Sequence, residues 1–238
     1  METIKNKNIL IVGATGGIGS ELVKLLKSSG ANLFITGRNE IKLNQIAVQY
    51  QIEENCCYIG DLTQKENIVQ LNQKYFNRYS TIDVLINASG IGIIKSSEQL
   101  TEEEFLQTLM LNVYSPFMII KSFLPSMKET KKGLIVHVPG VLGKVPMLGS
   151  AAYSASKYGL VGMLQSIREE IKRTEIRITN LFMGGVDSPF WDNIDLRVQK
   201  DKMITSEEAA KAIWFLCQQP TSGVISEMVL QPFNHQAI

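Results

Sequence analysis

The chain has 238 residues, with 24 lysines and arginines against 23 aspartates and glutamates and a formal net charge of +1. A charge this close to zero gives no indication of binding to nucleic acid or to an anionic membrane. The 45% hydrophobic and 20% charged content is typical of a folded globular protein and excludes a disordered chain. At this length one large α/β domain buries a core without disulfides or metal, so we predict a single domain over residues 1–238.

The cysteines and the N-terminus bear on the cellular compartment. Cys56, Cys57 and Cys217 have no metal-ligand spacing, and neighbours in one strand do not pair easily, so we predict buried thiols and no metal site. The N-terminus lacks the apolar core of a signal peptide, and no apolar run approaches the ~18 residues of a membrane span. We therefore expect a cytoplasmic protein that contacts no membrane.

Short apolar runs alternate with segments of helical period along most of the chain. We predict strands at residues 8–13, 32–36, 56–59, 84–87, 133–138, 177–182 and 227–230. We predict helices at residues 18–28, 40–50, 64–79, from the capping box that begins at Thr101, and at 112–130, 150–173 and 206–217. Such alternation predicts an α/β fold, a doubly wound parallel sheet of the Rossmann-like type with about seven strands and helices on both faces. The least regular part, residues 187–204, is predicted to cover a substrate.

A glycine-rich turn lies between the first predicted strand and the first predicted helix. It reads Gly13-Ala-Thr-Gly-Gly17-Ile-Gly19, with the spacing G-x-x-x-G-x-G. A phosphate needs close backbone approach and free N–H groups at a helix N-terminus. We predict that Gly13 permits the turn, Gly17 the approach and Gly19 the packing of helix on strand, which together indicate dinucleotide binding. The alternative is a turn without a ligand.

The end of the second strand bears on the choice of dinucleotide. An acidic residue there would hold a ribose 2′-hydroxyl, but the strand ends Thr36-Gly37-Arg38. Arg38 offers its guanidinium to a 2′-phosphate, a charge-assisted contact worth ~1.5–3 kcal/mol. The sequence therefore favours NADP(H) and leaves NAD(H) open. A solvated surface arginine is the alternative.

Tyr153 and Lys157 lie four residues apart in the predicted helix 150–173. This spacing brings a phenol and an ammonium to the same face, one turn apart. A phenol titrates near ~10, and a nearby fixed cation favours the phenolate, so we expect the pKa of Tyr153 to be lowered. The pair is suited to proton transfer.

Taken in order, Gly13, Gly17, Gly19, Asn87, Asn112, Tyr153 and Lys157 resemble the short-chain dehydrogenase/reductase family over essentially the whole chain. The resemblance implies hydride transfer between a nicotinamide and a carbonyl or secondary alcohol. Tyr153 would be the general acid and base, Lys157 would lower its pKa and hold the nicotinamide ribose, and Asn112, at a break between two helices, would position a relay water. A helix N-cap for Asn112 and a surface cation for Lys157 are the alternatives.

The resemblance also implies a binding surface and an assembly. Asp61 and Leu62 would reach the adenine, and members of the family commonly form homodimers or homotetramers through the segments that are here 112–130 and 150–173. The cofactor-binding residues expected on this basis are Gly13, Thr15, Gly17, Ile18, Gly19, Arg38, Asp61, Leu62, Asn87, Ala88, Tyr153, Lys157, Val186 and Ser188.

One departure from the family pattern concerns catalysis. A serine that hydrogen-bonds the reacting oxygen is expected thirteen residues before the tyrosine, where this chain has Gly140. Loss of one such donor costs about 10²–10³ in rate, which weakens a catalyst without removing it. The phenol, an ordered water, Ser89 or Ser150 are possible replacements.

Two functions follow from these observations. The first is an NADP(H)-dependent oxidoreductase acting on a small carbonyl compound or alcohol. The second is a dinucleotide-binding sensor or scaffold protein with weak or no turnover, which Gly140 favours. Some residues have a second interpretation. His137 is predicted to be a satisfied core or edge histidine. Five further residues either line an apolar substrate pocket or pack residues 187–204 against the core: Met147, Leu148, Phe182, Phe190 and Trp191.

Overall fold

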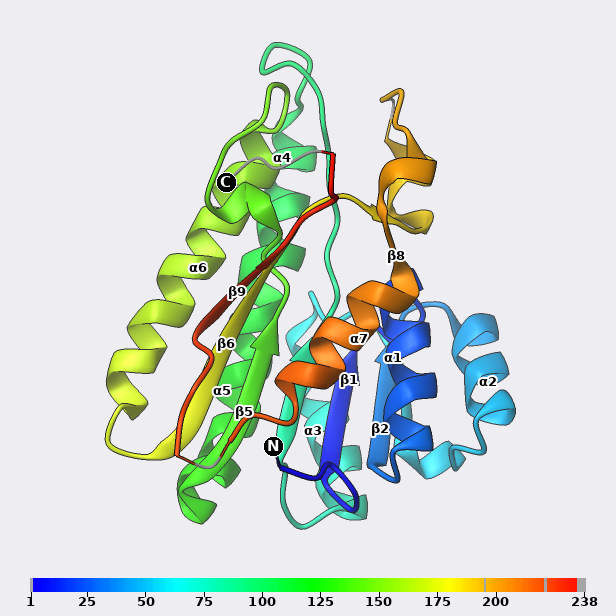
Figure 1. Cartoon of the computed structure of the whole chain (residues 1–238), viewed down its shortest axis with the longest axis vertical. Helices are drawn as coiled ribbons and strands as arrows, with labels where there is room; N and C mark the ends of the chain where they lie inside the picture. The colour runs from blue at the N-terminus through cyan, green and yellow to red at the C-terminus, as the bar shows by residue number, and fades with distance from the viewer. Residues whose placement is uncertain (1, 195, 221, 235–238) are drawn as a thin grey trace.

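The structure is a computed structural model that describes residues 2–194, 196–220 and 222–234. Its main sheet is parallel and has seven strands in the order β3-β2-β1-β4-β5-β6-β9 (Figure 1). The strands are β1 (Asn8–Val12), β2 (Asn32–Gly37), β3 (Cys57–Ile59), β4 (Val84–Asn87), β5 (Lys132–His137), β6 (Glu175–Met183) and β9 (Glu227–Leu230). The predicted doubly wound parallel sheet is confirmed.

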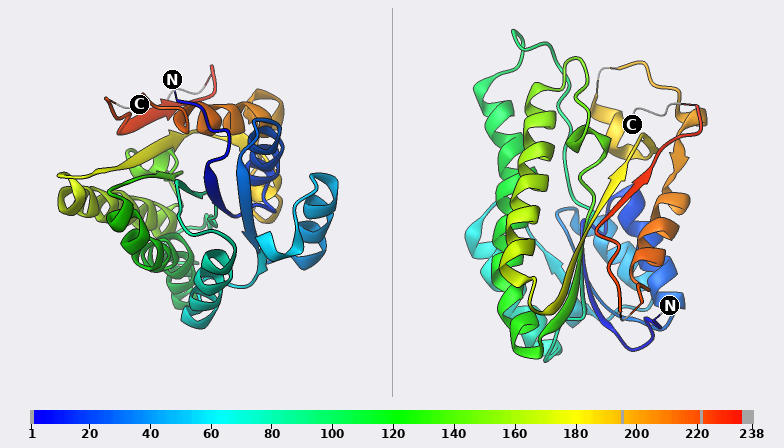
Figure 2. Two further views of the ribbon diagram at one scale, coloured as in Figure 1. Left: turned by 90° about the horizontal axis from the view of Figure 1, so that it is seen from below. Right: turned by 60° about the vertical axis from the view of Figure 1, so that its left-hand side comes forward.

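Two layers of helices cover the sheet (Figure 2). One layer contains α1 (Gly17–Ser28), α2 (Glu40–Gln49) and α7 (Ser206–Leu216), and the other contains α3 (Lys65–Arg78), α4 (Glu102–Leu109), α5 (Ser115–Thr130) and α6 (Ala151–Ile171). Because both faces are covered, the central strands are apolar along their length, and Ile9, Leu10 and Ile11 are fully buried. No helix in the described part of the chain is both long enough and apolar enough to cross a membrane.

The strand order reverses between β1 and β4. The connections that follow these two strands therefore leave on opposite sides of the sheet, and a crevice forms at their carboxyl ends. The glycine-rich turn enters this crevice from β1, and the loop that begins with Ala88 enters it from β4. A methyl group on Gly13, whose φ is +86°, would lie only 2.8 Å from the Ser89 nitrogen. Glycine is thus required where the two loops meet.

The junction between α4 and α5 differs from the predicted break between two helices. The chain stays helical through a π-helical turn, Met110–Tyr114, that joins them. Asn112 lies inside this turn and is buried, so it does not cap a helix. Single π-helical turns recur at functional sites, because the extra residue changes which side chains point inward.

Residues 187–204 are bounded by a small parallel pair that the sequence did not predict. β7 (Val186–Asp187) pairs with β8 (Ile204–Thr205), so the two ends of the segment lie side by side. The capping box of Thr205 and Glu208 then starts α7. Between the pair the chain forms two short 3-10 helices, Pro189–Asn193 and Lys200–Lys202. The segment leaves and re-enters the fold at one point beside the crevice.

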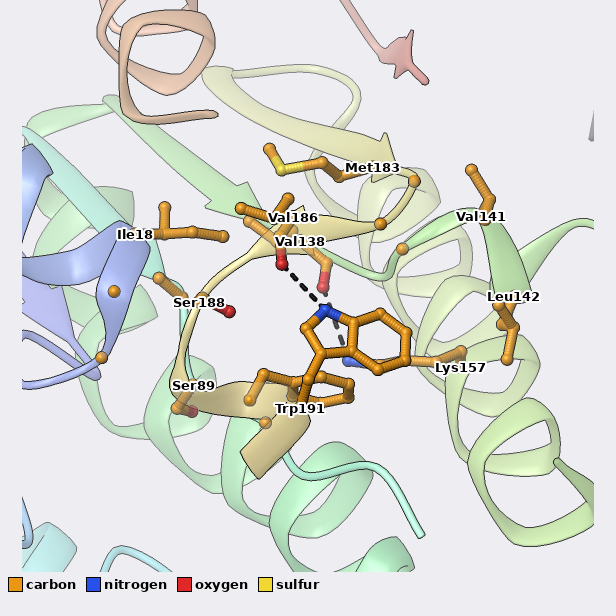
Figure 3. Close-up of a pocket in the computed structure, with 18 of the residues that line it drawn as sticks. Ile18, Ser89, Val138, Val141, Leu142, Lys157, Met183, Val186, Ser188 and Trp191 are labelled. Carbon is orange, nitrogen blue, oxygen red and sulfur yellow. Dashed lines mark hydrogen bonds between the residues drawn. The ribbon is translucent and has the colours of Figure 1, made fainter. Parts of the chain in front are cut away.

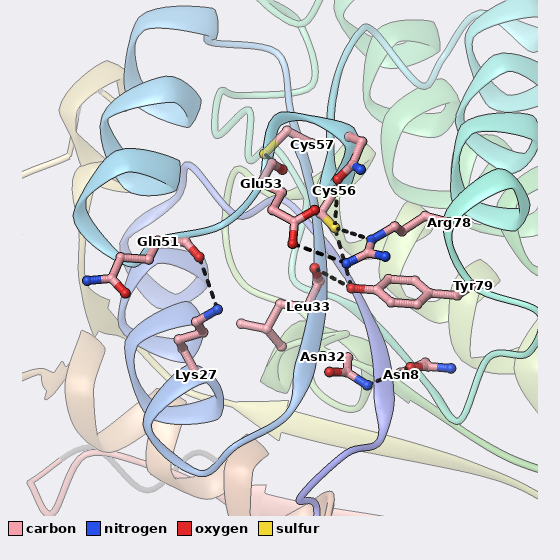
Figure 4. A network of polar contacts seen from close by, with 11 residues as sticks. Asn8, Lys27, Asn32, Leu33, Gln51, Glu53, Cys56, Cys57, Arg78 and Tyr79 are labelled. Carbon is pink, nitrogen blue, oxygen red and sulfur yellow. Dashed lines mark hydrogen bonds and ion pairs between the residues drawn. The ribbon is translucent and has the colours of Figure 1, made fainter.

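The three cysteines are buried free thiols, as predicted. Cys56 precedes β3, and its sulfur accepts a hydrogen bond from Arg78 Nε at 3.4 Å (Figure 4). The hydroxyl of Tyr79 lies 3.4 Å from the same sulfur, and Arg78 also pairs with Glu53 at 3.2 Å. These contacts tie the end of α3 to the start of β3, far along the chain from Tyr153.

Candidate active site

A hollow of about 260 Å³ lies at the carboxyl ends of the strands (Figure 3). The glycine-rich turn forms one wall, and the loop after β5 forms another. The remaining walls come from the first two turns of α6, which carry Tyr153 and Lys157, and from residues 183–191. The fold therefore brings the phosphate-binding turn and the predicted proton-transfer pair to one cavity.

Lys157 is buried, with 3% of its surface exposed, and has no ion-pair partner among the described residues. Its Nζ donates to the carbonyl oxygen of Val138 at 3.4 Å and lies 5.3 Å from the centre of the Tyr153 ring. Burial lowers the pKa of Lys157 to about 8, because desolvation disfavours the ammonium. The alternative of a surface cation is therefore wrong.

The pKa of Tyr153 departs from the expectation drawn from its neighbour. Burial raises the pKa of Tyr153 above its ordinary value, whereas the sequence predicted that Lys157 lowers it. Desolvation of the phenolate outweighs the ammonium, which lies over the ring at 5.3 Å and is itself only weakly favoured in its charged form. The phenol keeps its proton at neutral pH in this environment.

Asn112 connects the loop after β4 to α6. Its amide Nδ2 donates to the Ile91 carbonyl oxygen and to Ser156 Oγ, each at 2.9 Å, and its Oδ1 accepts from the Ile91 nitrogen at 3.0 Å. A methyl group on Gly90 would lie 3.3 Å from both Asn112 Oδ1 and Lys157 Nζ. The amide oxygen and the ammonium therefore face one small space.

Ser156 is a positioning residue that the sequence analysis missed. Its hydroxyl accepts from Asn112 and donates to the Tyr153 carbonyl oxygen at 2.7 Å. Ser156 lies between Tyr153 and Lys157 in the chain, but nothing in the sequence indicates that Asn112, 44 residues away, contacts it.

A second hollow of about 270 Å³ adjoins the first. Both are lined by Gly16, Ala88, Ser89 and Gly90, and the second extends to Arg38. Together they form one continuous path from Arg38, past the glycine-rich turn, to Tyr153.

The chemistry of the second hollow fits a polar ligand. Arg38 is exposed and makes no hydrogen bond or ion pair with the described residues, and no carboxylate lines the hollow. The buried hydroxyls of Thr36 and Ser115 also line it and have no hydrogen-bond partner in the described part of the chain. Groups that could satisfy these donors and this cation include a ribose and a phosphate, so the residues fit a phosphorylated dinucleotide.

Most of the predicted cofactor residues line one of the two hollows, and the others support the loops around them. The first hollow is lined by Gly17, Ile18, Ala88, Tyr153, Lys157, Val186 and Ser188, and the second by Gly13, Thr15, Arg38, Leu62 and Ala88. Four predicted residues line neither hollow: the cofactor residues Gly19, Asp61 and Asn87, and Asn112, which is predicted to act in catalysis.

Three of these four have supporting contacts that explain their place. A methyl group on Gly19 would lie 2.1 Å from the Gly13 carbonyl oxygen, so the start of α1 requires glycine there. The Asp61 carboxylate accepts from the nitrogen and hydroxyl of Thr63. Asn87 Oδ1 accepts from the nitrogen of Ser89 at 3.0 Å and from its hydroxyl at 2.6 Å. Asp61 and Asn87 thus shape the loops at the crevice.

Gly140 faces the phenol. A methyl group on this residue would lie 3.9 Å from Tyr153 Oη. Its backbone has a φ of +76° and a ψ of 164°, a conformation that is essentially restricted to glycine. Residue 140 therefore points at the reacting phenol, but its backbone is not shaped to carry a side chain.

Of the two serines considered as replacement donors, only Ser89 lies in the site, where it lines both hollows. Ser150 lines neither hollow. Its hydroxyl bonds to the backbone of Met147 and lies 2.7 Å from Ser154 Oγ.

His137 lies on the sheet near Lys157. Burial, together with a smaller contribution from the charge of Lys157, lowers its pKa to about 3. The histidine is therefore neutral, which fits the predicted core position. It is not satisfied as predicted, because its Nε2 has no hydrogen-bond partner among the described residues.

The fold and the site define a dinucleotide-binding oxidoreductase, because the phosphate-binding turn and the tyrosine–lysine pair share one crevice. A family model described as short chain dehydrogenase matches residues 7–199, and the chain belongs to this family. It is thus an oxidoreductase of a family that acts on CH–OH or C=O groups.

Individual relatives agree with this assignment. An uncharacterized oxidoreductase of Staphylococcus epidermidis is 26% identical over 232 residues, which cover 98% of this chain and all of that protein. The fold is similar to that of an alcohol dehydrogenase from the archaeon Thermococcus sibiricus complexed with 5-hydroxy-NADP, with a TM-score of 0.89, 24% identity and coverage of 98% and 100% of the two chains. It is also similar to that of a 3-ketoacyl-(acyl-carrier-protein) reductase from Brucella melitensis complexed with NADH, with a TM-score of 0.87, 20% identity and coverage of 97% and 98%.

The glycine-only backbone at residue 140 generates a prediction about stability. Gly140→Ser is expected to lower the free energy of unfolding by about 1–3 kcal/mol, because the serine must adopt a strained conformation. Urea denaturation followed by circular dichroism measures this loss. Gly162→Ala is the control, since Gly162 lies within α6 with no atom within 4 Å of an added methyl group, and it should be neutral or stabilising. Equal effects of the two changes would contradict the prediction.

Proposed function

We propose that the protein is an NADP(H)-dependent oxidoreductase that transfers hydride between the nicotinamide and a carbonyl carbon or secondary alcohol. The observation that carries this proposal is the placement of Tyr153 and Lys157 in the cavity that also contains the glycine-rich turn. A chain that only bound a dinucleotide would have no evident need to keep the phenol of Tyr153 together with Lys157 and Asn112.

Tyr153 acts as the proton donor in the direction of carbonyl reduction. A nicotinamide bound in this crevice would supply the hydride to the carbonyl carbon. The phenol gives its proton to the carbonyl oxygen, and its raised pKa keeps that proton available at neutral pH. In alcohol oxidation the same oxygen accepts a proton, a direction that higher pH favours.

Lys157 supplies charge at the cavity and takes part in returning the proton to Tyr153. With a pKa of about 8 it is mainly an ammonium at neutral pH, so it stabilises negative charge that develops on the phenol. Asn112 Oδ1 faces the same space beside Gly90 and has one remaining lone pair, which suits it to hold a relay water.

Gly140 takes the position of the missing serine. The absence of that donor is expected to cost about 10²–10³ in rate, or ~2.7–4 kcal/mol of transition-state stabilisation. Enzymes commonly accelerate reactions by ~10⁶ or more, so turnover persists at a reduced rate. The phenol itself is the donor we assign to the reacting oxygen, because the Ser89 hydroxyl donates its single proton to Asn87 Oδ1 at 2.6 Å.

A dinucleotide-binding sensor with weak or no turnover is the second candidate function. The glycine-only backbone at residue 140 favours it, because the chain is not shaped to present a serine to the substrate. The two functions share the same binding residues and differ only in whether Tyr153 transfers a proton.

We also propose a cytoplasmic protein that assembles as a homodimer or homotetramer through α5 and α6. Phe117 on α5 and Tyr158 on α6 have 41% and 44% of their surface exposed. Large exposed rings on these two helices support an assembly in which they become buried.

Replacing Tyr153 by phenylalanine tests the proposed function. Removal of the phenol oxygen is expected to reduce turnover of a carbonyl compound by about 10²–10⁴, because the general acid is lost. Affinity for NADPH should change little, and a fluorescence titration with the dinucleotide measures it. Wild-type protein that binds NADPH but reduces none of a panel of aldehydes and ketones would instead support the sensor.

The lowered pKa of Lys157 predicts the pH dependence of reduction. The ammonium is the active form, so kcat/KM for carbonyl reduction should fall as pH rises through about 8, approaching tenfold per pH unit above it. Lys157→Arg is the matched variant, because a guanidinium stays charged over this range. Its residual activity should show no fall near pH 8. A fall at the same pH in both proteins would show that another group titrates.

Arg38 predicts the preference for the phosphorylated cofactor. Arg38→Ala is expected to weaken NADPH binding about ten- to a hundredfold, since a charge-assisted contact to the 2′-phosphate is lost. Binding of NADH should change less than twofold, and titration of each cofactor against both proteins gives the comparison. A similar loss for both cofactors would rule out the role in 2′-phosphate recognition.

A further inference from the structure

The hollow beside Tyr153 is apolar and almost free of charge. Among the described residues that line it, Lys157 is the only one with a formal charge at neutral pH. Several of the apolar side chains that line the hollow come from three separate segments of the fold (Figure 3). They are Val138, Val141, Leu142, Met183, Phe190 and Trp191.

Two lysines on segments near the hollow form ion pairs with carboxylates outside it. Lys144, just after Leu142, pairs with Glu227 at 2.7 Å, and its Nζ lies over the ring of Phe182. In the segment that follows Trp191, Lys200 pairs with Asp192 at 2.9 Å. Neither lysine lines the hollow, so neither is placed to receive a carboxylate or phosphate there.

Phe190 and Trp191 form a fixed aromatic wall. The Phe190 ring lies 5.8 Å from the Tyr153 ring and 5.3 Å from the Trp191 ring. Its tip rests on Gly92, where a methyl group would lie 2.4 Å from Phe190 Cζ. Trp191 Nε1 donates to the Val186 carbonyl oxygen at 2.8 Å, which fixes the indole. The aromatic wall therefore lies directly beside the ring of Tyr153.

We propose that the substrate is an uncharged, largely apolar ketone, or the matching secondary alcohol, with an aryl or alkyl group that packs against Phe190. The proposal rests on the proposed function. The carbonyl carbon receives the hydride and the oxygen receives the Tyr153 proton, which gives the secondary alcohol. The site rejects compounds that carry a carboxylate on the reacting carbon.

Rejection of the carboxylate follows from its desolvation. A carboxylate beside the reacting carbon loses water on entering the hollow, and the Nζ of Lys157 faces Gly90 and the Tyr153 ring and donates to the Val138 carbonyl. An unpaired buried charge is disfavoured strongly enough to reduce binding by about a hundredfold or more. A carboxamide of the same size is uncharged, so its binding does not include the cost of burying a charge.

Phenylglyoxylamide and phenylglyoxylate test the proposal, because they share size and aryl group and differ in charge. With NADPH, kcat/KM should be about a hundredfold higher for the amide. Binding is measured independently of turnover from the fluorescence of Trp191, one of the chain's two tryptophans, in a Trp214→Phe background. The dissociation constants should show the same order of preference.

Two matched variants of Leu142 test whether the preference for the amide arises from the lack of a further cation in the hollow. Leu142→Lys places a cation in the hollow and should reduce the preference for the amide at least tenfold. Leu142→Met has a similar length without charge and should leave the ratio near its wild-type value. Thermal melts of both variants separate an altered site from an altered fold.

The outcomes separate the substrate class from the proposed function. Turnover with equal or better use of the carboxylate overturns the substrate class and leaves the oxidoreductase. Tight binding of the amide without any reduction supports the apolar site and overturns the proposed chemistry. Failure of both compounds to bind, or an unchanged ratio in Leu142→Lys, overturns the substrate class.

Discussion

The site depends on a lysine ammonium held inside the protein without a carboxylate. Among the described residues, the ammonium of Lys157 contacts only the Val138 carbonyl and the face of the Tyr153 ring, and the loss of solvation lowers its pKa to about 8. A protein tolerates such a cost where the charge acts on a ligand. The burial that weakens the ammonium also raises the pKa of Tyr153, so both groups are shifted by one apolar cavity. In the proposed function, the apolar wall therefore bears on the proton transfer and also on the choice of substrate.

A second constraint is the close approach of backbone segments around that cavity. The loops after β1 and β4 touch at Gly13 and Ser89, and the start of the segment 187–204 packs onto Gly17 through Ser188. Glycine is needed at these contacts because a Cβ would collide with the facing loop. At Gly140 the reason differs, since there the backbone conformation itself excludes a side chain. A serine at residue 140 would therefore be strained by the backbone of this loop.

Much of the fold could be predicted because it follows local rules. Alternating apolar runs and helical periods indicated the doubly wound sheet, and Thr101 with Glu104 marked a helix start that the structure confirms. The π-helical turn around Asn112 and the β7–β8 pair were missed, since neither has a local pattern of its own. The pKa of Tyr153 was predicted in the wrong direction, because spacing along a helix gives the position of a charge but not the degree of burial around it.

The sequence by itself determined the class of fold, the phosphate-binding turn and the convergence of Tyr153 with Lys157. These features depend on periodicity and on residues close together in the chain, where backbone geometry is fixed by short-range sterics. Only the tertiary structure decided the rest. It joined Asn112 to Ser156, set Phe190 against Tyr153 and left Arg38 without a partner among the residues that the structure describes. Such contacts arise from packing between segments that are far apart in the chain. The degree of solvation inside the resulting cavity also depends on that packing, so neighbouring residues in the sequence do not determine it.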